Sequence, residues 1–140
     1  MPFDYVKGRT RLRSFPKAAS VTFTARDLCI MTSGTLATAL NNSTTTVVGI
    51  TTKGVASTDG DYATAAARML VEVAADDNCV IRGDVGNGSL LTTSIGVKFG
   101  LTSAGAVDFA DTTDVVLMCV DFISASEGLF QLEESARWNT

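Results

Sequence analysis

Large apolar side chains recur at every second position in several parts of the chain, which is the pattern of strands that bury one face. In residues 91–101 one parity carries large apolar side chains, which are Leu91, Ile95, Val97, Phe99 and Leu101. We expect a half-buried antiparallel strand over residues 91–101, with one break in the alternation at Thr93. Residues 68–74 and 129–134 alternate in the same way and predict two further strands, with inward side chains at Met69, Val71, Val73, Phe130 and Leu132.

Two other stretches predict strands without simple alternation. Residues 114–123 (DVVLMCVDFI) are apolar on both faces, as expected of a central strand. Residues 44–55 (TTTVVGITTKGV) are β-branched but contain Gly49, and a glycine within a strand indicates a bulge or the close approach of another backbone. Short strands separated by Gly, Asn, Asp and Ser turns are typical of a sandwich or barrel.

The composition supports strands over helices along the whole chain. Thr, Val and Ile account for 38 of the 140 residues, against only 4 Lys, 4 Glu and 1 Gln. β-branched side chains suit a pleated sheet, whereas the unbranched helix formers are scarce. Only residues 63–68 (ATAAAR) suggest a helix, and that helix would be short. We therefore expect an all-β fold, a small antiparallel β-barrel or sandwich formed as a single domain by residues 21–140, with at most one short helix.

Residues 1–20 differ from the rest of the chain and predict an extended, basic N-terminal arm. Residues 1–17 hold five basic residues and one acidic residue, a net charge of +4, whereas residues 18–140 carry a net charge of −8. Four of the cations fall at every second position, which places them on one side of an extended chain: Lys7, Arg9, Arg11 and Arg13. Pro16 holds Phe15 in an extended conformation. Such an arm can lie on an acidic surface or add to a sheet edge, the alternative being a solvated tail.

Nothing in the sequence predicts an enzyme or a cofactor site. The chain has no histidine, which removes the commonest general acid–base group and metal ligand. Gly86-Asn87-Gly88 lacks the third glycine and the helix of a dinucleotide loop, and no Walker sequence occurs, so we interpret it as a hairpin turn. The paired aspartates lie in turn-like contexts and predict turns rather than catalysis or metal binding: Asp59 with Asp61, Asp76 with Asp77, and Asp111 with Asp114.

The remaining signals exclude several partners. The three cysteines, Cys29, Cys79 and Cys119, show no CxxC pattern, so we expect no disulfide framework. The acidic body would repel nucleic acid. We see no signal peptide, and the longest strongly apolar run, residues 115–120, is too short to span a membrane, so no membrane partner is expected. We interpret the tripeptide Arg82-Gly83-Asp84 as part of the same turn region as Gly86.

Residues 95–134 resemble the C-terminal half of bacteriophage capsid decoration proteins, also called cement or head-stabilising proteins. The matching residues form a strand and turn followed by an apolar strand and a final short strand. They are Ile95, Gly96, Phe99, Leu101, Thr102, Ala104, Val107, Asp108, Phe122, Ile123, Ser124, Ala125, Ser126, Gly128, Phe130 and Leu132. The resemblance covers about the last third of the chain and rests on packing and turn motifs.

The resemblance implies a small β-barrel or sandwich, commonly a homotrimer, on the outside of an icosahedral head. Such a protein is made in the host cytoplasm and clamps neighbouring major capsid protein subunits, without catalysis or a cofactor. By their charge and extended geometry, the arm residues are our expected capsid contacts: Lys7, Arg9, Arg11, Arg13, Phe15 and Lys17.

Two other functions remain open from the sequence. One is a different phage β-barrel protein, such as a tail-tube or head–tail joining subunit. The other is a carbohydrate- or ligand-binding β-sandwich, which would need aromatic platforms. Beside the phenylalanines, only Tyr5, Tyr62 and Trp138 could supply them.

Overall fold

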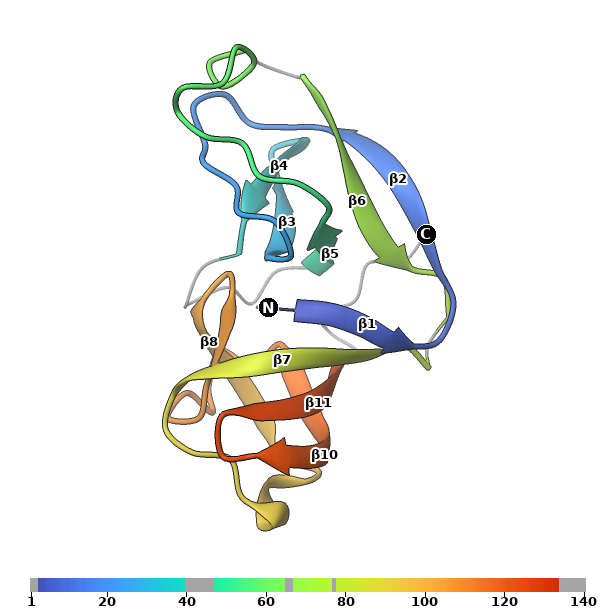
Figure 1. Ribbon diagram of the computed structural model, residues 1–140, viewed down its shortest axis with the longest axis vertical. Coiled ribbons are helices and arrows are strands. Elements are labelled where there is room, and N and C mark those ends of the chain that lie inside the picture. Colours follow the sequence, from blue (N-terminus) through green and yellow to red (C-terminus); the bar gives the residue numbers. More distant parts are fainter. Residues whose placement is uncertain (1–2, 40–46, 65–66, 77, 134–140) are drawn as a thin grey trace.

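The computed structural model describes residues 3–39, 47–64, 67–76 and 78–133, which form two curved β-sheets (Figure 1). The first sheet has the strand order β1-β7-β11-β10-β8-β9. Its strands are β1 (Phe3–Lys7), β7 (Val80–Asn87), β8 (Lys98–Ser103), β9 (Ala106–Asp108), β10 (Leu117–Ser124) and β11 (Glu127–Leu132). Because β9 also pairs in parallel with β7, the five strands from β7 to β11 close into a barrel.

The second sheet lies above the barrel in Figure 1 and has the order β2-β6-β5-β3-β4. Its strands are β2 (Thr10–Pro16), β3 (Leu28–Thr32), β4 (Thr35–Thr38), β5 (Val47–Thr51) and β6 (Arg68–Ala74). All its pairings between strands are antiparallel. The sheet curls until the end of β2 reaches the opposite edge, where Lys17 bridges Leu36 of β4.

The predicted all-β fold is confirmed. The described residues contain no α-helix, and their one helical element is the 3-10 helix η1 (Thr92–Ser94). Part of the predicted short helix, residues 65–66, lies outside the described residues, and Arg68 begins strand β6. The strands predicted over residues 68–74 and 129–134 are present as β6 and β11, with all five expected inward side chains buried.

The N-terminal residues contribute one strand to each sheet. β1 pairs with β7 of the first sheet, and β2 pairs along its whole length with β6 of the second. Between them the chain turns at Gly8, which has a φ of +90° and lies so close to Cys79 that a Cβ would come within 2.7 Å of the Cys79 Cα. The segment expected to be an arm is extended, but its two strands lie within the two sheets.

Two clusters of buried side chains form the core. The larger fills the barrel and continues under β3 and β5, and it includes the fully buried Phe3. The smaller is enclosed by the second sheet and includes Phe15 and Phe23. Because Cys29 packs in the smaller cluster and its neighbour Leu28 in the larger, strand β3 is buried on both faces. Strand β3 therefore lies between the two clusters and contributes side chains to both.

The strand predicted over residues 91–101 is present only over its last four residues, 98–101. β8 begins at Lys98, with Phe99 and Leu101 buried as expected, whereas Leu91, Ile95 and Val97 are exposed. Hydroxyl-bearing residues at positions 92–94 favour local turns, and Ser94 donates its N–H to the carbonyl of Leu91 and accepts the Leu91 N–H on its side chain. The break in the alternation at Thr93 marks this 3-10 helix.

Gly86-Asn87-Gly88 turns the chain but does not form the predicted hairpin. Gly88 has a φ of +83°, the left-handed conformation expected at a turn. The strands on either side of it do not pair, since the described neighbours of β7 are β1, β11 and β9. The interpretation of Arg82-Gly83-Asp84 as a turn is wrong, because all three residues lie within β7 and pair with β11, and Arg82 and Gly83 also pair with β1. Gly83 is required there by packing, as a Cβ would lie 2.6 Å from the Phe3 ring.

All three cysteines, Cys29, Cys79 and Cys119, are free and buried. Burial raises the pKa of the Cys29 thiol from its ordinary value of about 9 to about 12. The folded state therefore holds this proton more tightly than the unfolded state does. Burial also raises the pKa of Tyr5, which acts in the same direction at a higher pH.

We expect the free energy of unfolding to fall as the pH rises from about 9 towards about 12, because the Cys29 thiol must stay protonated in the fold. Urea titrations followed by circular dichroism at several alkaline pH values would measure this slope. The Cys29→Ala variant should start less stable and show a shallower slope, with the Tyr5 contribution retained. An unchanged slope in that variant would contradict the assignment to Cys29.

Candidate protein-docking edge

Strand β2 is an edge strand of the second sheet and forms the right-hand flank of the molecule in Figure 1. Lys7, Arg9 and Arg11 are exposed, and Arg13 is half-buried. Arg11 lies opposite Val73 and Arg13 opposite Val71, so both lie on the side of β2 that faces the smaller core. Of the four alternating cations, only Arg11 and Arg13 lie within β2 and share one of its sides, because Lys7 ends β1 and the chain turns at Gly8 before Arg9.

Further along β2 the same side becomes part of the core. Phe15 is buried in the smaller cluster, and the Arg13 guanidinium lies 5.5 Å from the centre of its ring. The Phe15 ring therefore packs against the Arg13 guanidinium. Because Phe15 is buried, it is not available as the capsid contact expected from the sequence. The alternation in the sequence shows which residues lie on the same side of a strand. It does not show at which residue that side becomes buried by the rest of the fold.

Lys17 is fully buried and cannot contact a partner. Its ammonium donates to the carbonyl of Tyr62 at 3.0 Å and to those of Ala18 and Thr64 at 3.4 Å. Its backbone N–H donates to Ala67 at 2.8 Å. The expectation that Lys17 is a capsid contact is wrong, because its charge is used to fix the loop around Tyr62 where the second sheet closes.

Arg9 anchors the start of β2. Its backbone N–H donates to the carboxylate of Asp76 at 3.1 Å, and its guanidinium Nε lies 3.6 Å from the same oxygen. The pKa of Asp76 is lowered, first by the Arg9 N–H and then by that of Asn78. The Arg9 side chain is still 85% exposed, so most of it is available to a partner.

The structure adds apolar and basic residues that sequence reasoning missed. Leu12 and Leu70 are 60% and 47% exposed. Since Leu12 lies opposite Glu72 and Ser14 opposite Leu70, the two leucines are diagonal neighbours on the outer face of β2 and β6. Arg68 lies beside them and donates to the side chain and the carbonyl of Ser14 at 3.1 and 3.0 Å.

A shallow depression adjoins these residues and is lined by Ser14, Thr52, Lys53, Arg68, Met69 and Leu70. We define the β2 edge surface as Arg9, Arg11, Leu12, Arg13, Arg68 and Leu70. Leu12 could have been noticed in the sequence as the apolar residue between Arg11 and Arg13. Leu70 joins the surface only through the pairing of β6 with β2.

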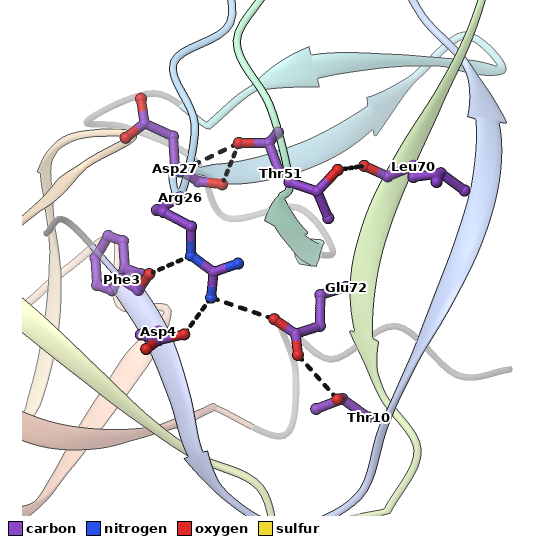
Figure 2. A network of polar contacts seen from close by, with 9 residues as sticks. Phe3, Asp4, Thr10, Arg26, Asp27, Thr51, Leu70 and Glu72 are labelled. Carbon is purple, nitrogen blue, oxygen red and sulfur yellow. Dashed lines mark hydrogen bonds and ion pairs between the residues drawn. The ribbon is translucent and has the colours of Figure 1, made fainter.

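A polar network around Arg26 links β1 of the first sheet to β2 and β6 of the second sheet (Figure 2). The Arg26 guanidinium forms an ion pair with Asp4 of β1, lies 3.2 Å from the Glu72 carboxylate of β6 and donates to the Phe3 carbonyl at 3.3 Å. Thr10 of β2 donates its hydroxyl to Glu72 at 2.9 Å. Arg26 has a φ of +69°, a conformation that is uncommon for a residue with a side chain. The network holds β2 in a defined position relative to the barrel.

The described residues give little support to other kinds of site. They contain no group of three or more Cys, Asp or Glu side chains placed to hold a metal ion. Asp111 accepts the backbone N–H groups of Thr113 and Asp114, and Asp59 accepts that of Ala56, so both have the predicted turn role. The partner of Asp76 in the sequence, residue 77, lies outside the described residues.

Neither described tyrosine presents a fully exposed ring that could act as an aromatic platform. Tyr5 and Tyr62 are both half-buried, and Trp138 lies outside the described residues. In the described part of the chain, no helix is long and apolar enough to cross a membrane.

Comparison with known proteins gives a likeness of fold to a solved structure. No protein-family model and no curated protein matches the chain. Among solved structures, the chain is similar to the head fiber gp8.5 N base of bacteriophage phi29, with a TM-score of 0.51 and 16% sequence identity. The match covers 93% of this chain and 100% of that chain. At this identity the likeness is one of fold, and it extends over both sheets.

Proposed function

We propose that this chain is a structural protein of a bacteriophage head, located on the capsid exterior, where it clamps adjacent major capsid protein subunits. The observation that carries the proposal is the likeness in fold, over 93% of the chain, to a base domain of a phage head fiber. The resemblance of residues 95–134 to capsid decoration proteins supports the same class of function independently.

The β2 edge surface is our proposed contact with the capsid. It presents three arginines from consecutive odd positions of the N-terminal segment beside two exposed leucines. Residues 80–133 form the barrel and carry only Arg82 and Lys98 against seven acidic residues. The molecule therefore has a basic edge and an acidic barrel, and this asymmetry would orient it towards an acidic capsid surface.

We further propose that the protein acts as a homotrimer. A single β2 edge surface offers few contacts, and surface charge pairs are individually weak. Three linked copies would raise the avidity by about 10²–10⁴ without new contacts, provided that all three edges reach the capsid together. Mass measurement in solution would give the oligomeric state directly.

The proposal predicts that the Arg11→Glu, Arg13→Glu double variant binds heads at least about tenfold more weakly than the natural protein. The heads are those of the phage whose genome carries this gene, and bound protein is measured by co-sedimentation over a range of salt concentrations. Binding of the natural protein should weaken as salt rises, because the contacts are between exposed charges.

A matched control is the Arg82→Glu, Lys98→Glu double variant, which changes the net charge equally on the barrel. Both side chains are about half exposed and form surface ion pairs with Glu127 and Glu133, so their reversal should cost little stability. Equal loss of binding in both variants would contradict docking through β2. Failure of the natural protein to bind heads, with labelled protein found on tails instead, would contradict the proposed function.

A further inference from the structure

The outer edge of β2 carries backbone groups that are free to pair with another strand. Arg9 accepts the N–H of Ala75 at 2.7 Å, and Lys17 donates its N–H to Ala67 at 2.8 Å. The register between β2 and β6 is continuous between these two points. In an antiparallel ladder alternate residues bond to the same neighbour, so the odd-numbered residues of β2 bond to β6. The N–H and C=O groups of the even-numbered residues point away from the sheet.

The unpaired backbone groups of β2 cover only a few residues and end at Ser14. No other described strand pairs with β2 over residues 10–16. The carbonyl of Ser14 is bonded by Arg68, and Pro16 has no N–H to offer. The groups open to a partner are therefore the N–H and C=O of Thr10 and Leu12 and the N–H of Ser14.

The side chains beside this edge decide what can pair with it. A second copy of β2 in antiparallel pairing would bring the arginines of one strand close to those of the other, and like charges across a strand pair are destabilising. An extended segment with acidic residues at alternate positions would place its carboxylates beside Arg11 and Arg13 instead. Leu12, on the other face of β2, would lie beside its apolar positions.

We propose that an extended acidic segment of a partner protein adds as a strand to the free edge of β2 at Thr10, Leu12 and Ser14. This inference rests on the proposed function, for which it specifies the chemistry of the capsid partner and the mode of contact. Backbone hydrogen bonds hold the strand, and Arg11 and Arg13 select an acidic sequence.

The first test uses a synthetic peptide of alternating Glu and Thr residues and the isotopically labelled full-length protein. We expect amide hydrogen exchange at Thr10, Leu12 and Ser14 to slow by about tenfold at saturating peptide, because these N–H groups become bonded. A peptide of the same sequence with its alternate backbone nitrogens methylated keeps the charge but cannot complete the ladder, so it should give no protection. Equal effects of the two peptides, or no binding of the acidic peptide at its highest soluble concentration, would overturn the proposal.

The second test compares Leu12→Pro with Leu12→Ala in binding to phage heads. Proline removes the outward N–H while leaving the bonds between β2 and β6, whereas alanine removes only the side chain. We expect Leu12→Pro to bind about threefold to tenfold more weakly than Leu12→Ala, the equivalent of one lost backbone hydrogen bond. If Leu12→Pro fails to fold, the two peptides still decide the question.

The outcomes separate this inference from the proposed function. Loss of head binding on reversal of Arg11 and Arg13, with equal binding of the two Leu12 variants, would overturn strand addition and leave the capsid role intact. Absence of binding by the natural protein would refute the capsid role itself. Dimers of the protein that depend on the Leu12 N–H would show that a second copy occupies the edge, against the proposal.

Discussion

Deletion of residues 1–17 is expected to leave a chain that does not fold cooperatively. The deletion removes β1 from the first sheet and β2 from the second, together with Phe3 and Phe15, one from each core cluster. Loss of one buried phenylalanine side chain costs about 3–5 kcal/mol, and a domain has only about 5–15 kcal/mol in total. Far-ultraviolet circular dichroism and urea titration would show a weak β signal and no cooperative transition.

The control for this deletion replaces Arg9, Arg11 and Arg13 by alanine and keeps both strands. That triple variant should retain a cooperative transition, because the three side chains lie at the sheet edge. A truncated chain that unfolded at the same urea concentration as the natural protein would contradict the structural role of β1 and β2. Binding experiments should therefore use substitutions, because loss of binding after truncation would report unfolding rather than a lost contact.

The sequence predicts the class of fold because the β signal is local. Alternation places Met69, Val71 and Val73 on one face of β6, and the structure buries all three. The same reasoning is wrong at Leu91, Ile95 and Val97, where residues 92–94 form a 3-10 helix within the apparent strand. Apolar and polar residues can alternate over a few positions both in a strand and in an irregular segment that leads into a strand. The alternation alone therefore cannot distinguish the two.

The candidate site was predictable only in part, because its limits depend on contacts between distant segments. The alternating cations identify one side of β2, but the burial of Lys17 depends on the carbonyls of Tyr62 and Thr64. In the same way, Leu70 joins the β2 edge surface through the register with Ser14. Arg26 has no sequence signal at all, and its role follows from the meeting of Asp4 and Glu72.

Gly49→Ala is the point substitution for which we expect the largest loss of stability, about 3 kcal/mol or more. Sequence reasoning predicted a bulge or close backbone approach at this glycine, and the structure confirms the approach. A Cβ at position 49 would lie 2.2 Å from the carbonyl oxygen of Glu72 and 2.9 Å from a methyl carbon of Val71. Relief of that overlap would move β5 away from β6. Because β6 is also the strand that pairs with β2, we expect the variant to bind heads more weakly as well.

The measurement is the urea midpoint, which should fall by about 1–3 M for a change of this size. Gly60→Ala is the matched control, since a Cβ there meets nothing within 4 Å and its φ is not positive. That variant should differ from the natural protein by less than about 1 kcal/mol, and any change should favour the fold through the unfolded state. Equal midpoints for the two variants would mean that β5 and β6 are not held this closely in solution. The support that β6 gives to the β2 edge surface would then have to come from the Arg26 network and the smaller core cluster.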